Sequence, residues 1–459
     1  MDTLNEIFSQ ISSFLWGWPM IILLLGTHLF LTFRLRLPQR YIGKAIKLSV
    51  KRDKNSTGDV SQFGALATAL AATVGTGNIV GVATAVALGG PGAVLWCWLT
   101  GVFGIATKYG EGLLAIEYRQ KTAKGRMLGG PMYALEKGLG WKKMAILFSI
   151  FTVLASFGIG NTVQANAISN LTFETYGIPT WITGAFVAIL TGLVILGGVK
   201  AITRVCVILV PFMAIFYVVG CIVILCFNHA YLWEAIKLIG ESAFRPQAAG
   251  GGFVGASVIM AARYGIARGL FSNESGLGSA PIVAAAAKTK NPVRQALVSS
   301  TGTFWDTVVI CALTGLVIVS SIIAYPDISY SDGGTLTKVA FCKIPYIGAP
   351  LLSVSLLTFA FSTILGWSYY GERAMEYLRS TRVSIHAYRI TFVVAIFFGS
   401  IVSLPLVWNV ADCMNALMAI PNLLSLLFLS GVIVKETRKY LWNKALDMEM
   451  DEDFDDNDD

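Results

Sequence analysis

The sequence predicts an all-α membrane protein that crosses the bilayer many times. Of its 459 residues, 55% are hydrophobic and only 14% are charged, whereas soluble domains carry about a quarter charged residues. The mean hydropathy is +0.66, and runs of about 20 apolar residues, the length of a transmembrane helix, recur along the chain. These observations exclude a soluble enzyme, a secreted disulfide scaffold and a nucleic-acid-binding protein.

Eleven apolar runs are expected to form the spans. They lie at 13–34, 62–88, 93–118, 143–171, 179–197, 204–227, 251–287, 295–324, 348–371, 387–404 and 406–434. The loops on the side that includes 34–54 carry 28 Lys and Arg residues, and the opposite loops carry four. Because basic loops stay in the cytoplasm, we expect a multi-pass plasma-membrane protein with its N-terminus outside and its C-terminus in the cytoplasm.

Composition divides the chain into four parts. Residues 1–60 hold one extra helix and a basic cytoplasmic loop, 61–230 a first set of five helices, and 231–440 a second set of five. Residues 441–459 form an acidic tail, since the last thirteen residues hold nine of the 27 acids and no base. Such a run predicts a disordered cytoplasmic extension, either a solvated tail or an interaction segment.

Two segments are interrupted by glycine and polar residues at mid-membrane, namely 71–78 and 264–276. They lie five spans apart, an odd number, and therefore cross the membrane in opposite senses. Interrupted helices at matching positions of two antiparallel halves are the sequence sign of a secondary transporter built from inverted repeats.

The first interruption frees backbone groups that can bind ligands. The half-helix that begins near Thr76 presents N–H donors suited to a carboxylate, and the carbonyls near Ala71 and Val74 suit a small hard cation. Gly75 and Gly77 let a ligand approach the backbone closely. The alternative is that these glycines only allow tight helix packing.

Polar residues in other spans are further candidates. Asn161 and Gln164 share a helix face and either line a cavity or join helices by hydrogen bonds. Ser362 and Thr363 either complete a cation site with the first broken helix or bond back to their own helix. Trp367 follows one turn later.

Ionisable residues within spans are candidates for function. We expect Arg263, Arg268 and Glu274 to pair among themselves and hold the broken helix, whereas Asp306 and Asp412 have no assigned role. Nothing in the sequence assembles a catalytic triad or a zinc site, so neither an enzyme nor a cofactor is expected.

Three motifs then point to a family. Thr73-Val74-Gly75-Thr76-Gly77-Asn78-Ile79-Val80-Gly81, the Gly89–Ala93 stretch and the Gly269–Pro281 stretch resemble the alanine or glycine:cation (sodium:alanine) symporter family of the amino acid–polyamine–organocation superfamily. The resemblance covers almost the whole chain except the acidic tail. It implies a LeuT-like fold of five-plus-five inverted repeats with one extra helix, here the first, and uptake of alanine and glycine coupled to sodium, sometimes to protons.

The resemblance also implies site residues. Backbone N–H groups of Thr76 and Gly77 would bind the substrate carboxylate, while Phe271 and Trp367 restrict the volume of the pocket. The implied substrate residues are Thr76, Gly77, Gln164, Phe271, Thr363 and Trp367. The implied sodium ligands are the carbonyls of Ala71, Val74 and Phe359 and the hydroxyls of Ser362 and Thr363. A possible second cation site would use Thr73 and Asn78.

The chemistry of the first cation site favours Na⁺. All five implied ligands are neutral oxygens, and a proton would need a titratable group there. A lysine ammonium group that reached the cavity could replace a bound cation. No lysine lies deep in the fifth core helix, however, since Lys200 sits at its cytoplasmic end. The alternatives are a proton-coupled carrier of another small zwitterion and a channel. A channel builds its filter from oligomeric rings, whereas this chain holds two halves in one polypeptide and is expected to act as a monomer with a small amino acid, sodium and lipid as partners.

Overall fold

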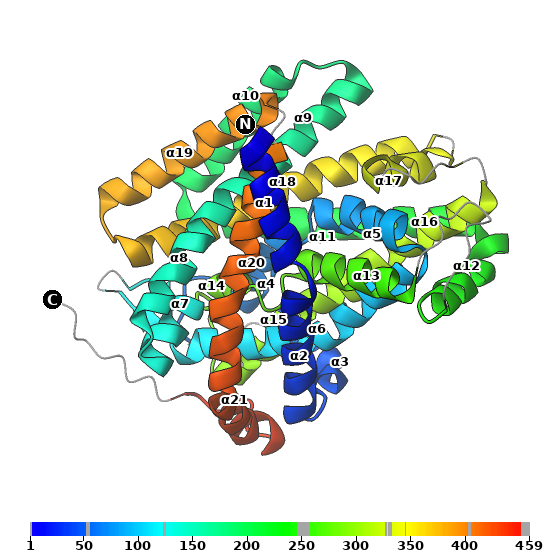
Figure 1. Cartoon of the computed structure of the whole chain (residues 1–459). Coiled ribbons are helices and arrows are strands. Elements are labelled where there is room, and N and C mark those ends of the chain that lie inside the picture. The colour runs from blue at the N-terminus through cyan, green and yellow to red at the C-terminus, as the bar shows by residue number, and fades with distance from the viewer. Residues whose placement is uncertain are drawn as a thin grey trace.

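The computed structural model describes residues 2–51, 56–122, 125–245, 257–325, 328, 333–344, 346–402 and 405–450. This part of the chain is helical almost throughout (Figure 1). Its one small hairpin joins β1 (Gln120–Lys121) to β2 (Met127–Leu128) in antiparallel register. The prediction of an all-α membrane protein is therefore confirmed.

Helices of the N-terminal half follow the expected order. They are α1 (Asp2–Leu15), α2 (Trp18–Arg34), η1 (Pro38–Tyr41), α3 (Ile42–Val50), α4 (Gln62–Thr73), η2 (Gly77–Gly81), α5 (Val82–Gly89), α6 (Gly92–Glu117), α7 (Pro131–Tyr133), η3 (Ala134–Gly138), α8 (Lys142–Phe157), η4 (Gly158–Thr162), α9 (Val163–Tyr176), α10 (Thr180–Leu196) and α11 (Gly198–Phe227).

The C-terminal half adds two helices between expected spans, α12 and α17. Its elements are α12 (His229–Ser242), α13 (Val258–Asn273), α14 (Ala280–Ala284), α15 (Pro292–Thr303), η5 (Phe304–Cys311), α16 (Ala312–Ala324), α17 (Gly333–Cys342), α18 (Gly348–Leu378), α19 (Arg382–Ile401), α20 (Pro405–Phe428), α21 (Ser430–Thr437) and η6 (Arg438–Trp442). The start of the expected span 251–287 lies outside the described residues.

Seven helices of the described residues are long and apolar enough to cross a membrane, or eight if the bent pair α4 and η2–α5 counts as one span. The other expected spans coincide with α6, α10 and α13–α14. Of these, α10 has only 17 residues, and α6 carries Lys108 and Glu111 in its interior. Length and hydropathy alone therefore identify fewer spans than the eleven expected.

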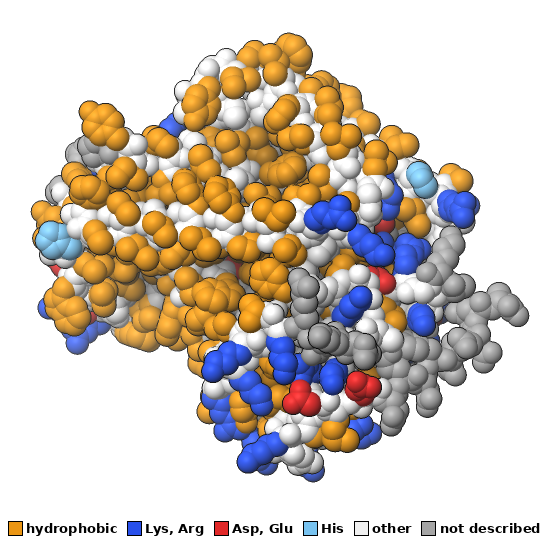
Figure 2. Space-filling view, turned by 180° about the vertical axis from the view of Figure 1, so that it is seen from behind, with side chains coloured by type: hydrophobic (Ala, Val, Ile, Leu, Met, Phe, Trp, Pro, Cys, Tyr) orange, Lys and Arg blue, Asp and Glu red, His pale blue; other side chains and the backbone are white. Residues whose placement is uncertain are grey.

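The surface has a broad apolar face. Figure 2 shows a broad apolar face, with Lys and Arg gathered mainly at one end of the molecule. Large apolar side chains such as Leu193 and Ile208 are 68% and 72% exposed, which would be unfavourable in water. This surface fits a multi-pass membrane protein.

The extra N-terminal helix is longer than expected. It begins at Asp2 rather than at residue 13, and α1 runs alongside α20 (Figure 1). The Asn409 side chain donates to Asn5 at 2.8 Å, and the Trp16 indole donates to the Asp412 carbonyl at 3.0 Å. Polar residues at the start of this helix lowered its hydropathy in the sequence, but α20 gives some of them partners.

The first predicted interruption is confirmed. Helix α4 ends at Thr73, Val74 is extended with φ −76° and ψ 95°, and the chain turns by 54° before it continues as η2 and α5. The change of direction falls inside the predicted segment 71–78.

The second interruption lies later than predicted. Residues 264–273 are helical, and α13 ends only at Asn273; the next residue, Glu274, has a φ of +52°. Gly276 and Gly278 follow with φ of +93° and +85°, a conformation that favours glycine. By contrast, a Cβ on Gly269 would lie 2.1 Å from the Thr100 hydroxyl. Gly269 therefore serves close packing of α13 on α6 and does not interrupt the helix.

The acidic tail is described only as far as Met450. The Arg294 guanidinium donates to the Asp447 carboxylate at 2.8 Å, and the Met450 N–H donates to the Lys290 carbonyl at 2.8 Å. Residues 446–450 thus pack on the start of α15 and the residues just before it. Residues 451–459, the rest of the expected disordered extension, lie outside the described residues.

Candidate substrate and cation sites

One buried cavity lies between the interruption of α4, the end of α13, α18, α20 and the α8–η4–α9 helix. All six residues implied as substrate ligands line it. They are Thr76, Gly77, Gln164, Phe271, Thr363 and Trp367. These residues come from four separate segments of the chain, and the fold brings them together around a small space.

The interruption of α4 shapes one wall of the cavity. The Asn78 side chain accepts a hydrogen bond from the Gly75 N–H at 2.9 Å, which stabilises the turn between the two half-helices. A Cβ on Gly75 would lie 2.6 Å from the Thr363 hydroxyl, so this position needs glycine for α18 to approach. The N-terminus of the second half-helix, at Thr76 and Gly77, then faces the cavity.

Gln164 forms the part of the cavity wall beside Thr76. It follows the π-helical turn η4, and its amide nitrogen donates to the Ile159 carbonyl at 3.0 Å and to the Thr76 hydroxyl at 3.3 Å. Its amide oxygen is buried and has no hydrogen-bond partner among the described residues. Asn161, its expected neighbour on the same face, instead donates to the Phe392 carbonyl at 2.7 Å and acts as a link between helices.

Two aromatic side chains close the cavity. The Trp367 side chain is almost fully buried, and its indole N–H donates to the Glu274 carboxylate at 3.1 Å. Phe271 packs edge-on against Trp16 of the extra helix, with 6.3 Å between ring centres. The extra helix therefore supports a residue that limits the volume of the cavity.

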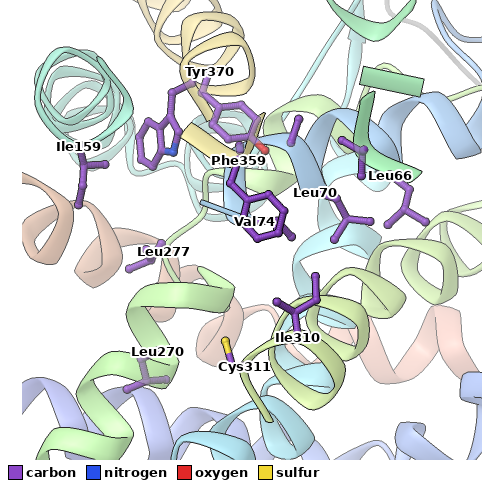
Figure 3. Packing of buried hydrophobic residues seen from close by; sticks show 14 of the residues in the cluster. Leu66, Leu70, Val74, Ile159, Leu270, Leu277, Ile310, Cys311, Phe359 and Tyr370 are labelled. Carbon is purple, nitrogen blue, oxygen red and sulfur yellow. The ribbon is translucent and has the colours of Figure 1, made fainter. Parts of the chain in front are cut away.

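Next to the cavity, five oxygens from α4 and α18 lie close together, and they are the five that the resemblance implied for sodium. The Ser362 hydroxyl lies 3.1 Å from the Ala71 carbonyl and 2.8 Å from the Phe359 carbonyl. The Thr363 hydroxyl lies 3.0 Å from the Phe359 carbonyl and 3.5 Å from the Val74 carbonyl. Figure 3 shows Val74 and Phe359 packed side by side where the two helices meet. All five residues are buried.

The two residues of the possible second cation site have different surroundings. Thr73 lines the cavity, and its hydroxyl lies 3.4 Å from the Leu70 carbonyl. Asn78 points away toward η5, where it donates to the Asp306 carboxylate at 2.7 Å. Asp306 also accepts from Ser272 at 3.1 Å and from Thr307 at 2.7 Å. Sequence reasoning noted Asp306 as an ionisable residue in a span but did not assign it to this site.

The expected pairing of Glu274 with Arg263 and Arg268 is wrong. Glu274 instead accepts hydrogen bonds from Ser279 and Trp367, while the Arg263 guanidinium lies over the Tyr264 ring. The arginines lie on the helical part of α13, whereas Glu274 lies past its end, where the backbone has already turned away.

The second interruption is held by neighbouring helices. The Glu111 carboxylate of α6 accepts from the N–H groups of Gly276 and Gly278 at 3.0 and 3.1 Å, and from the Asn422 amide at 2.8 Å. Lys108 forms an ion pair with Glu111 at 3.7 Å and donates to the Glu274 carbonyl at 3.1 Å. Fixed donors and acceptors thus replace the missing helical hydrogen bonds.

Sequence reasoning did not single out four residues that line the cavity, namely Ala72, Ile159, Ser272 and Asn415. It named Gly75 for the close approach of a ligand, and Glu274 only for pairing with arginines. Ser272 and Glu274 lie in the conspicuous Gly269–Pro281 stretch and could have been chosen from it. Asn415 stands in an apolar run, and no pattern in the sequence places it at the cavity.

The sequence and the fold of this chain are both similar to those of known transport proteins. The chain is 50% identical over 443 residues to a sodium/alanine symporter of Methanococcus maripaludis, over 95% of this chain and 97% of that one. Its fold is similar to that of the transporter MhsT (TM-score 0.58, 16% identity, 85% of this chain and 95% of that one). It is also similar to a Na⁺-coupled sialic acid symporter (TM-score 0.52, 13% identity, 92% and 86%).

These structural similarities establish a LeuT-like fold, with the first and sixth core helices discontinuous at 74–76 and 274–279. The model of the sodium:alanine symporter family matches residues 1–455. The chain therefore belongs to the sodium:alanine symporter family, whose members are transporters and not enzymes.

Proposed function

We propose that this protein couples the inward movement of Na⁺ to the uptake of small neutral amino acids, alanine and glycine. The observation that carries the proposal is the position of Thr363. This residue lines the cavity, and its hydroxyl also belongs to the group of five oxygens beside the Val74 and Phe359 carbonyls. A cation bound there orders the same backbone that presents Thr76 and Gly77 to the substrate.

The proposed substrate site follows from the half-helix geometry. Backbone N–H groups at a helix N-terminus favour an anion, so Thr76 and Gly77 bind the substrate carboxylate. Phe271 and Trp367 leave room only for a small side chain. Gln164 and Thr363, which both line the cavity, supply polar contacts.

The proposed sodium site consists of Ala71, Val74, Phe359, Ser362 and Thr363. Five neutral oxygens suit Na⁺ and offer no group that could carry a proton in its place. We extend the possible second cation site from Thr73 and Asn78 to Asp306. The Asp306 carboxylate accepts a hydrogen bond from the Asn78 amide at 2.7 Å and is fully buried.

Transport then proceeds by alternating access, in which one five-helix repeat (61–230) moves against the other (231–440) around the central site. The protein works as a monomer, with its N-terminus outside and its C-terminus in the cytoplasm. Apart from the transported sodium it needs no cofactor.

Uptake of labelled alanine into proteoliposomes tests this proposal. We expect accumulation above equilibrium with an inward Na⁺ gradient and none when choline replaces sodium. Accumulation driven by a pH gradient alone would refute sodium coupling and favour a proton-coupled carrier. Uptake that only equilibrates under every gradient would point to a channel.

A further inference from the structure

Of the described residues that line the cavity, Glu274 alone has a charged side chain. Its carboxylate accepts one hydrogen bond from Trp367 at 3.1 Å and one from Ser279 at 2.5 Å. A carboxylate can accept about four, so roughly half of its capacity is unused. Within the described residues it forms no ion pair, because Lys108 pairs with Glu111 and reaches only the Glu274 carbonyl.

Two further acceptors in the same cavity lack donors. The amide oxygens of Gln164 and Asn415 are buried and without a hydrogen-bond partner in the described structure. The orientation of the Gln164 amide is fixed by its neighbours, because its nitrogen lies 3.0 Å from the Ile159 carbonyl, which can only accept. Exchanging nitrogen and oxygen would place two acceptors against each other.

Buried acceptors without donors are unfavourable, and a buried charge without a counter-charge is more so. A primary ammonium group supplies what is missing, since it carries one positive charge and three N–H donors. We propose that Glu274, together with the amide oxygens of Gln164 and Asn415, binds the ammonium group of the substrate. This inference rests on the proposed function, in which Thr76 and Gly77 hold the carboxylate.

The site then selects a chemical class and not only a size. A substrate must carry a free primary ammonium group close to its carboxylate. Sarcosine is an isomer of alanine with its methyl group on nitrogen, and propionate is alanine without the ammonium group. Neither satisfies the three acceptors, although each is as small as alanine or smaller.

Competition against labelled alanine tests the assignment in the purified full-length protein at saturating sodium. For the wild type, we expect both analogues to compete at least about 100-fold more weakly than alanine. A site built to accept hydrogen bonds from a substrate N–H group rejects analogues that leave its acceptors unpaired, and propionate has no N–H group while sarcosine has one fewer than alanine. In Glu274→Gln, alanine affinity should fall by about 10- to 100-fold, while the affinity for propionate changes much less. The ratio of the alanine affinity to the propionate affinity therefore falls by nearly the same factor as the alanine affinity.

Glu234→Gln is the matched control. It makes the same chemical change at an exposed glutamate of α12 that does not line the cavity, so the alanine-to-propionate ratio should stay within about threefold of the wild type. If Glu274→Gln does not fold, the comparison of alanine with sarcosine and propionate in the wild type still tests the site.

Three results would overturn the proposal. In the first, sarcosine or propionate competes as well as alanine in the wild type. In the second, Glu274→Gln leaves the affinity ratio unchanged. In the third, Glu274→Gln alters only the pH dependence of uptake, which would make the carboxylate a proton carrier. A wild-type protein that takes up no alanine refutes the proposed function and this site with it, whereas uptake with an unchanged ratio refutes the ammonium site alone.

Discussion

Replacing Trp367 by alanine should widen the substrate range of the transporter. The Trp367 side chain is 1% exposed and lines the cavity, so its removal opens space inside the proposed substrate pocket. A leucine side chain has three more carbons than that of alanine. At about 0.8 kcal/mol per buried CH₂ group, filling the new space is worth about 2.4 kcal/mol, or roughly a 50-fold gain for leucine relative to alanine.

Competition by leucine for sodium-dependent uptake of labelled alanine measures this gain. Alanine itself should bind more weakly to Trp367→Ala, because its methyl group loses a wall. Trp367→Phe serves as the control, since it keeps most of the aromatic surface and should still exclude leucine. An unchanged order of alanine over leucine in a folded Trp367→Ala protein would show that Trp367 only packs against its neighbours.

Three further predictions concern the cation sites and the packing of α13. Ser362→Ala removes one of five oxygens, so the sodium concentration for half-maximal alanine uptake should rise about 10-fold or more; an unchanged sodium dependence would remove Ser362 from the ligands. Asp306→Asn should lower the number of sodium ions carried per alanine, measured as the ratio of ²²Na⁺ to alanine flux, and an unaltered ratio would exclude a second cation at Asp306. Gly269→Leu should destabilise the protein by at least about 1–3 kcal/mol, because a Cβ there would lie 2.1 Å from the Thr100 hydroxyl. The melting temperature in detergent checks this, with Gly240→Leu as the control, since a Cβ at Gly240 meets nothing within 4 Å; equal melting temperatures would contradict the packing argument.

The first interruption could be placed from sequence because its polar residues, Thr73, Thr76 and Asn78, coincide with its glycines. The second could be recognised but not placed. The sequence does not distinguish Gly269 from Gly276, yet Gly269 packs against α6 and Gly276 adopts a positive φ. Only the neighbouring helix distinguishes them.

The residues of the cavity and of the cation sites also divide into those that sequence patterns indicate and those that only the fold reveals. Its residues on the interrupted helix and on α18 could be anticipated, because local patterns mark backbone that leaves the helix and paired hydroxyls. Asn415 and Asp306 could not be assigned, because single polar residues in apolar runs acquire their meaning from partners distant in sequence. Asp306 lies 228 positions from Asn78, with which it forms a hydrogen bond.

The hydrogen bonds of Glu111 have a consequence for where the protein bends. Three donors from two segments converge on one carboxylate oxygen at the second interruption, and each such bond to a charged group contributes about 1.5–3 kcal/mol. The first interruption is tied within its own segment, through Gly75 and Asn78, and to a carboxylate of another helix, because Asn78 donates to Asp306 at 2.7 Å. Each interruption is therefore fixed to a different helix. The turn at 274–279 is expected to move together with α6, and the turn at 74–76 together with η5.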